Sequence, residues 1–227
     1  FVVDPSEFNP VHKCLEDNNL NLKFVLNTHH HFDHVGGNSE LKQKYGCKIV
    51  GSKLDEDRIP KIDILLKEGD HWNFKENSAQ VIEIPGHTTG HIAFYFEDEK
   101  IVFTGDTLFA LGCGRLFEGT PEMMWNSLKK LKKLPDNTKV YCGHEYTLSN
   151  AKFIKSVVSN NLINKKIEEL KKLELDKTPS IPSTIKEEKE LNLFLQSDNS
   201  NLKLHLNIKD KTDEETFAYL RNLKDNF

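Results

Sequence analysis

Residues 28–34 constrain this chain most, because Thr-His-His-His-Phe-Asp-His follows a short, mostly apolar run at residues 22–26 that is typical of a buried strand. Gly36 and Gly37 come next and free the backbone before a helix. The segment is therefore expected on a connection from strand to helix. Its spacing lets two imidazoles bind one cation while a carboxylate and a third imidazole face a second one. Mixed imidazole and carboxylate ligands suit zinc, iron or manganese better than calcium or magnesium.

Three later segments repeat one order, in which a strand-like run is followed by a glycine and then by a residue that can bind metal. These residues are His87 after Gly86, Asp106 after Gly105, and His144 after Gly143. Loops at one edge of a β-scaffold often carry a site in this way. A surface histidine tract with incidental metal affinity would explain the first cluster but not the later ones. The sequence therefore predicts one shared metal site.

The pattern of apolar residues changes near residue 147. Before it, short apolar runs alternate with turns and a few helices, such as 121–133, which indicates a mixed α/β domain. After it, residues 151–173 have a helical period, and the proline-rich segment 178–182 ends that helix. A second helix is expected after Thr184 and a third over 213–223. The sequence thus predicts an α/β domain followed by a smaller all-helical domain.

The composition of the chain limits the classes of binding partner and the cellular compartment that we expect. The 227 residues include 31 basic and 35 acidic ones, a net charge of −4 that gives no reason to expect nucleic acid. The mean hydropathy is −0.56, and no apolar stretch approaches the roughly 20 residues of a membrane helix, so we expect a soluble protein without a membrane partner. Four scattered cysteines favour a reducing compartment, the cytoplasm. The chain begins without Met and within a strand, so we expect a missing N-terminal segment, which leaves an upstream targeting peptide open.

The set His-x-His-x-Asp-His, followed in order by His87, Asp106 and His144, resembles the metallo-β-lactamase superfamily. Within it, residues 105–109, 112–119 and 141–147 are similar to the glyoxalase II, or hydroxyacylglutathione hydrolase, family, and the resemblance covers nearly the whole chain. It implies an αββα sandwich over residues 1–147, with the family's N-terminal hairpin missing. It also implies a helical substrate-binding domain over residues 148–227.

The resemblance implies two divalent metal ions per chain, with zinc as the first expectation and iron or manganese as alternatives. It assigns His29, His31 and His87 to one metal. It assigns Asp33, His34 and His144 to the other, and Asp106 would bridge the two. His91 also follows a glycine, but the Pro-Gly-His pattern matches His87, which leaves His91 a supporting role.

The same resemblance assigns a set of residues to the substrate: Arg115, Leu116, Phe117, His144, Glu145, Tyr146, Arg221 and Lys224. Arg221 and Lys224 would hold a terminal carboxylate of glutathione. Without the family, an exposed charge pair is the simpler interpretation of these two residues. Phe117 stands where the family usually has an aromatic hydroxyl, and Arg115 stands where it usually has lysine, so the details of binding are expected to differ.

The implied activity is hydrolysis of the thioester of an S-(2-hydroxyacyl)glutathione such as S-D-lactoylglutathione, the last step of methylglyoxal detoxification. Two cations would generate a hydroxide nucleophile near neutral pH, with Asp106 and Asp33 as the catalytic carboxylates. A glutathione persulfide dioxygenase with one iron is an alternative, although it lacks the His-Glu-Tyr-Thr sequence and the helical domain. A non-catalytic metal- or glutathione-binding module is another. We expect a monomer, and the sequence leaves the metal and the acyl group open.

Overall fold

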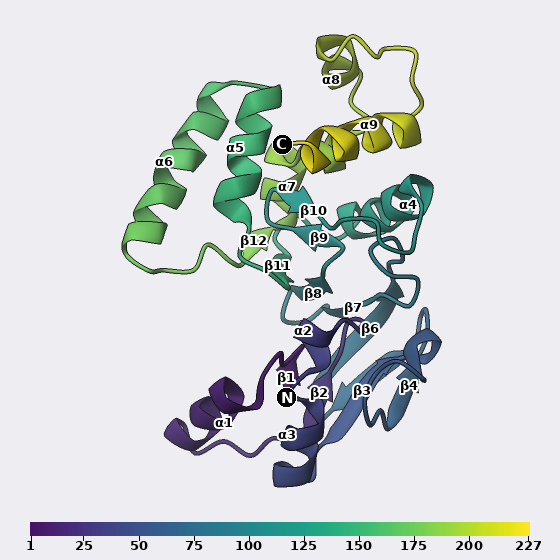
Figure 1. Cartoon of the computed structure of the whole chain (residues 1–227), viewed down its shortest axis with the longest axis vertical. Helices are drawn as coiled ribbons and strands as arrows, with labels where there is room; N and C mark the ends of the chain where they lie inside the picture. Colours follow the sequence, from purple (N-terminus) through teal and green to yellow (C-terminus); the bar gives the residue numbers. More distant parts are fainter.

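The computed structural model describes residues 1–227, which form two large β-sheets and a small two-stranded one, with helices outside the large sheets (Figure 1). The first sheet is parallel, in the order β1-β2-β3-β4, and consists of β1 (Val2–Val3), β2 (Phe24–Leu26), β3 (Lys48–Ser52) and β4 (Ile64–Leu66). The second sheet is mixed, in the order β12-β11-β8-β7-β6-β5. Its strands are β5 (His71–Phe74), β6 (Asn77–Glu83), β7 (Ile92–Phe96), β8 (Ile101–Gly105), β11 (Lys139–Cys142) and β12 (Ser183–Thr184).

A first apolar core fills the space between the two sheets. Leu26 and Val50 of the parallel sheet pack with Trp72, Val81 and Phe94 of the mixed sheet. Because successive side chains of a strand point to opposite faces, the neighbours of these residues turn outward. The central strand β7 is buried along its whole length, as expected for a strand covered on both faces.

Helices cover the outer faces. The helices α1 (Phe8–Asp17) and α3 (Asn38–Tyr45) pack on the parallel sheet, and α4 (Pro121–Lys132) packs on the mixed sheet. The predicted start of α4 is confirmed, since Pro121 opens it and the Thr120 side chain accepts a hydrogen bond from the backbone of Met123. Shorter elements complete this part: α2 (Phe32–Val35), the 3-10 turn η1 (Lys53–Asp55), β9 (Leu108–Phe109) and β10 (Gly112–Cys113). The predicted αββα sandwich is confirmed.

The C-terminal region is mostly helical and forms the upper part of Figure 1. Its elements are α5 (Thr147–Val157), α6 (Asn161–Leu175), α7 (Ile185–Leu191), the 3-10 turn η2 (Leu193–Gln196), α8 (Ser200–His205) and α9 (Asp213–Asp225). The predicted starts of α7 and α9 are confirmed. The prediction of one continuous helix over residues 151–173 was wrong. Val158 is extended and ends α5, and the Asn160 side chain caps a new helix, α6, by accepting a hydrogen bond from Ile163 N.

A second apolar core joins this helical region to the mixed sheet. Val140 of β11, Trp125 of α4, Phe153 of α5 and Phe217 of α9 belong to one buried cluster. In addition, β12 of the C-terminal region pairs with β11 and extends the mixed sheet. The helical region is therefore held against the sandwich by shared core and sheet contacts.

Two expectations from composition concern cysteines and membrane helices. All four cysteines are free thiols, as expected for a chain without a disulfide framework. None of the helices has the length and apolar character needed to cross a bilayer.

Candidate metal centre and substrate cavity

The predicted ligands lie on connections that leave the ends of strands. His29 and His31 follow β2, Asp33 and His34 lie on α2, His87 follows β6, Asp106 follows β8, and His144 follows β11. Since β6, β8 and β11 run in the same direction, their carboxyl ends meet at one edge of the mixed sheet. The fold thus brings residues more than 100 positions apart into one site.

His29, His31 and His87 form the first group, whose ligand atoms lie within 4.8 Å of one another. His87 Nε2 lies 3.0 Å from His31 Nδ1. Burial lowers the pKa of all three imidazoles, and at His29 neighbouring imidazoles lower it further. They therefore favour the neutral form, which is the form that binds metal. His29 Nε2 is buried and has no hydrogen-bond partner, so the group fits a cation.

Asp33, His34 and His144 form the second group, also within 4.8 Å. His144 Nε2 lies 3.3 Å from Asp33 Oδ2, and His34 Nε2 lies 3.8 Å from it. A hydrogen bond to Asp106 raises the pKa of His144. At His34 burial opposes protonation, but bonds to Asp106 and Asp4 outweigh it and raise the pKa to about 10. The carboxylates thus draw positive charge to this group, which a divalent cation can supply.

Asp106 lies between the two groups. Its Oδ1 is 3.3 Å from His34 Nε2, and its Oδ2 is 3.3 Å from His144 Nε2 and 3.6 Å from His87 Nε2. Burial opposes ionisation, yet the hydrogen bonds to His144 and His34 lower the pKa of Asp106. One ionised carboxylate therefore faces both groups, as a bridging ligand must.

Asp4 supports the second group and, through Thr28, the first. Its carboxylate accepts bonds from Thr28 N at 2.8 Å and Thr28 Oγ1 at 2.7 Å, and its Oδ2 lies 3.0 Å from His34 Nδ1. Thr28 Oγ1 is in turn 3.0 Å from His29 Nδ1. Such outer contacts fix the tautomer and direction of metal-binding imidazoles. Asp4 thus orients two candidate ligands from the end of β1.

The two other histidines of these motifs lie behind the ligands. His91 Nε2 accepts a bond from Asp106 N at 3.0 Å, and its ring stacks on His29 with centroids 4.5 Å apart. His91 thus contacts both Asp106 and His29, as expected for a residue that supports the site. His30 turns away from the two groups, with its Nδ1 3.4 Å from Asp55 Oδ2.

The structure contains a salt-bridge network behind His30 that was not predicted from the sequence. Arg58 donates to the buried Asp55 and, at 2.7 Å, to Glu118 Oε1. Glu118 also accepts a bond from Thr89 N at 2.7 Å. The network connects the segments that carry His31, His87 and Phe117. No local pattern marks Arg58, because its partner Glu118 is 60 residues further along the chain.

A cavity of about 750 Å³ opens beside the two groups. Of the residues predicted to bind metal or substrate, it is lined by His31, Asp33, His87, Asp106, Arg115, Phe117, His144, Tyr146, Arg221 and Lys224. His29 and His34, which are buried, do not line it, and neither do Leu116 and Glu145. Leu116 packs against the second core, and Glu145 instead accepts a bond from Ser180 N at 3.1 Å.

The cationic side chains of this cavity differ in their exposure and in the contacts that they already make within the protein. Arg115 has a side chain that is 69% exposed. Lys224 Nζ lies over the rings of Phe153 and Phe227, 5.2 and 5.0 Å from their centroids. Arg221 is buried and already donates to Asp225 Oδ1 and the backbone oxygen of Cys113. Arg115 and Lys224 are therefore the cations best placed for an anionic ligand.

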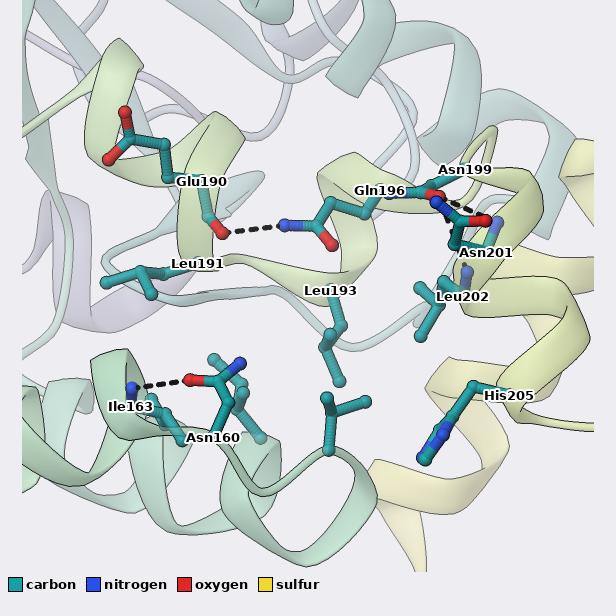
Figure 2. A pocket seen from close by; sticks show the side chains of 12 residues that line it. Asn160, Ile163, Glu190, Leu191, Leu193, Gln196, Asn199, Asn201, Leu202 and His205 are labelled. Carbon is teal, nitrogen blue, oxygen red and sulfur yellow. Dashed lines mark hydrogen bonds between the residues drawn. The ribbon is translucent and has the colours of Figure 1, made fainter.

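A smaller cavity of about 260 Å³ lies among α5, α6, α7, η2 and α8 (Figure 2). Three of its polar side chains are bonded to backbone groups. Asn160 accepts from Ile163 N, Gln196 donates to Glu190 O, and Asn199 accepts from Asn201 N (Figure 2). These side chains stabilise the ends of helices and do not converge on a ligand. The larger cavity is the candidate site.

The sandwich and its metal-ligand groups define a class of protein, the metallo-β-lactamase superfamily. The family described as "Metallo-beta-lactamase superfamily" matches residues 1–144. The family described as "Hydroxyacylglutathione hydrolase C-terminus" matches residues 145–227. The two matches together span the chain.

Curated relatives narrow this class. The hydroxyacylglutathione hydrolase of Pelagibacter ubique is 55% identical over 100% of this chain and 89% of that protein. The hydroxyacylglutathione hydrolase of Methylococcus capsulatus is 45% identical over 99% of this chain and 88% of that protein. The chain therefore belongs to the hydroxyacylglutathione hydrolase family.

Solved structures share the fold at lower identity. ETHE1 from Myxococcus xanthus superimposes with a TM-score of 0.67 and 25% identity, covering 98% of this chain and 80% of that one. A protein called TTHA1623, solved in a di-iron-bound form, gives a TM-score of 0.55 and 31% identity, covering 63% of this chain and 80% of that one.

Proposed function

We propose that this chain hydrolyses the thioester of an S-(2-hydroxyacyl)glutathione, such as S-D-lactoylglutathione, to glutathione and a 2-hydroxy acid. The observation that carries the proposal is one cavity that joins Asp106 and both ligand groups to the cations Arg115 and Lys224. Membership of the hydroxyacylglutathione hydrolase family supports the same reaction. With the lactoyl substrate, the reaction is the last step of methylglyoxal detoxification.

The proposal includes two divalent cations per chain, zinc first, with iron or manganese as alternatives. The ligand sets are His29, His31 and His87 for one cation and Asp33, His34 and His144 for the other, with Asp106 shared. His29 Nε2, which is buried and has no hydrogen-bond partner, supports this assignment. Bound cations supply a water of lowered pKa and a Lewis acid for the carbonyl oxygen.

Two carboxylates of the chain act on the attacking water. Asp33 and Asp106 both line the cavity, where they accept hydrogen bonds from that water and aim it at the thioester carbon. Water adds to the carbonyl, the carbon–sulfur bond breaks, and glutathione leaves as a thiolate. A thiol has a pKa of about 8.5, so the leaving sulfur needs little help from an acid. The water proton passes by way of Asp33, the more exposed carboxylate, to solvent.

Remote groups hold the glutathione half. Lys224, with Arg221 beside it, binds a terminal carboxylate, and Arg115 and Tyr146 bind nearer the thioester. Phe117 and His144, which also line the cavity, complete the set, whereas Leu116 and Glu145 do not line it and are left out of the proposed site. We place the boundary between the catalytic and substrate-binding domains after Thr147, within the first turn of α5. Since one chain supplies every residue of this site, a monomer suffices.

The test compares two reactions on one preparation of the metal-loaded protein. With S-D-lactoylglutathione, we expect thiol release at a rate that saturates with substrate. With glutathione persulfide, we expect no O₂ consumption. Oxygen uptake without thioester hydrolysis would replace the proposal with the persulfide dioxygenase. No turnover of either substrate, with metal bound, would favour a non-catalytic binding module.

A further inference from the structure

The loop of residues 110–117, here called the substrate loop, is held by buried side chains of the helical region. Four consecutive residues of its backbone are each bound by a different side chain. Ala110 O accepts from Asn150 Nδ2 at 3.0 Å, Leu111 N donates to Glu188 Oε2 at 2.9 Å, Gly112 O accepts from Asn192 Nδ2 at 2.9 Å, and Cys113 O accepts from Arg221 Nη1 at 3.0 Å. The four side chains come from α5, α7, the end of α7, and α9.

The conformation of this backbone needs such support. Leu111 has a φ of +60°, which is unfavourable for a leucine. A Cβ at Gly112 would lie 2.4 Å from Asn150 Nδ2, so a larger residue at this position would displace the Asn150 side chain that binds Ala110 O. Glu188 and Asn192 are completely buried, so loss of either would leave a buried partner without a hydrogen bond. The helical region thus imposes the shape of the loop.

The other end of the substrate loop contacts the metal centre. His87 Nδ1 lies 2.8 Å from Arg115 O, and Phe117 N donates to His87 O at 3.2 Å. Just before Arg115, Gly114 N donates to Thr107 O at 3.3 Å. Because the contact at Nδ1 sets the direction of the imidazole and leaves Nε2 for a metal, a shift of the loop would turn His87. The same shift would displace the Arg115 side chain.

We propose that Glu188 is a positioning residue, which with Asn192 holds the substrate loop where it orients His87 toward the metal and Arg115 toward the substrate. One oxygen of Glu188, Oε2, accepts from both Leu111 N and Asn192 Nδ2, each at 2.9 Å. Glu188 therefore fixes both the loop and the side chain that binds the next residue of the loop. The part concerning Arg115 rests on the proposed hydrolysis, whereas the part concerning His87 rests only on the proposed metal site.

The chemistry of Glu188 agrees with a specific task. Its carboxyl group is buried and forms no salt bridge, and burial raises its pKa to about 7. A buried carboxyl group without a salt bridge is costly compared with an apolar side chain, but an apolar side chain at this position would leave Leu111 N and Asn192 Nδ2 without their acceptor. Its bonded neighbours are neutral groups of the loop and of α7. The group is thus suited to accept hydrogen bonds from backbone and amide donors.

Three variants of the full chain test the proposal. Glu188→Leu removes the acceptor, Glu188→Gln keeps an oxygen for Leu111 N, and Glu190→Gln changes an exposed carboxylate on the same helix. The first readout is the zinc dissociation constant of the metal-free protein, measured against a chelator of known affinity. The second is the division between KM and kcat for S-D-lactoylglutathione.

We expect Glu188→Leu to weaken zinc binding by about tenfold, the lower end of effects seen for outer-layer partners of metal ligands, and to raise KM by a similar factor. Glu188→Gln should recover most of both losses, and Glu190→Gln should match the parent protein. Zinc affinity and KM within about twofold of the parent in Glu188→Leu would overturn the proposal. Equal losses in the Gln and Leu variants would overturn it as well.

A further variant decides the matter if Glu188→Leu does not fold. Asn150→Ala removes only the bond to Ala110 O and should weaken zinc binding and raise KM by about threefold. Parent-like values in Asn150→Ala would then reject the proposal. If the parent protein did not hydrolyse the thioester, the proposed function would fail, while the zinc measurements would still test the positioning of His87.

Discussion

The ligand segment 28–34 and the substrate loop 110–117 serve the same cavity but are built in different ways. The first gathers four candidate ligands within seven residues, just after β2. The second takes its shape from Asn150, Glu188 and Arg221. These residues lie 40, 77 and 108 positions beyond the loop residues that they bind. Candidate metal ligands can therefore be predicted from a local pattern, whereas the proposed orientation of His87 depends on distant helices.

Asp106→Asn tests the local half of this comparison and has the largest expected effect. The amide removes the charge that faces His34, His87 and His144, so metal content should fall together with kcat, the latter by about 100- to 1000-fold, or roughly 3–4 kcal/mol. Metal analysis and steady-state kinetics measure both. Asp98→Asn, in an exposed turn, is the matched control. Two metals per chain and normal turnover in Asp106→Asn would rule out a bridging role.

Lys224→Ala sharpens the comparison, because it removes a cation of the helical region without touching the loop. If Lys224 binds a carboxylate of the substrate, KM should rise by an amount equal to about 1.5–3 kcal/mol while kcat changes little. Lys209→Ala, which alters an exposed lysine, serves as the control. A KM equal to that of the parent would remove Lys224 from the carboxylate site.

Glu188→Gln tests the part of the comparison that concerns the distant helices. It does so by measuring how the stability of the metal-free protein depends on the protonation of Glu188. Burial raises the folded-state pKa of Glu188 to about 7, above its unfolded value near 4.5. The folded state therefore binds more protons in this interval, and the free energy of unfolding falls as pH rises through it. Glutamine does not titrate, so from pH 5 to pH 8 the variant should gain about 1–3 kcal/mol relative to the parent.

Urea unfolding at several pH values measures this difference. The comparison between variant and parent cancels the titration of all other groups. Glu190→Gln should follow the parent curve, because Glu190 is exposed. A constant difference between Glu188→Gln and the parent at every pH would show that Glu188 has an ordinary pKa.

Phe117→Tyr has the smallest expected effect. The ring lies at the cavity mouth, 63% exposed and 5.1 Å from the His87 ring. An added hydroxyl that bonds the glutathione backbone should lower KM several-fold at nearly constant kcat, a gain of about 0.5–1.5 kcal/mol. A higher KM with normal metal content would mean that the loop presents the substrate differently.

Much of the sandwich and the convergence of the ligand-type side chains could be predicted from sequence. Strand-like runs ending in glycine and a ligand-type residue place His87, Asp106 and His144 at one sheet edge, and the structure brings them together with residues 29–34. The comparison of two Gly-His pairs also predicted that His91 supports the site, and its contacts with Asp106 and His29 agree with that prediction. These signals are local, so a sequence pattern retains them.

The rest depends on contacts between distant segments. Nothing near Glu188 or Arg58 in the sequence indicates that one binds the substrate loop and the other binds Glu118. The break between α5 and α6 was missed because apolar residues keep a helical period across it, while Val158 and the Asn160 cap end the helix. The sequence suggested that Arg221 and Lys224 bind the substrate carboxylate equally. In the structure, however, Arg221 already donates hydrogen bonds to Asp225 and to the backbone of Cys113.

Stepwise zinc titration of the metal-free protein tests the central claim most directly, since the claim is that two ligand groups sharing Asp106 form one hydrolytic centre. Bound zinc and the rate of S-D-lactoylglutathione hydrolysis would be measured on the same samples. We predict saturation at two zinc ions per chain, with activity reaching its maximum only as the second ion binds. Full activity at one zinc ion per chain, or two bound zinc ions without hydrolysis, would contradict it.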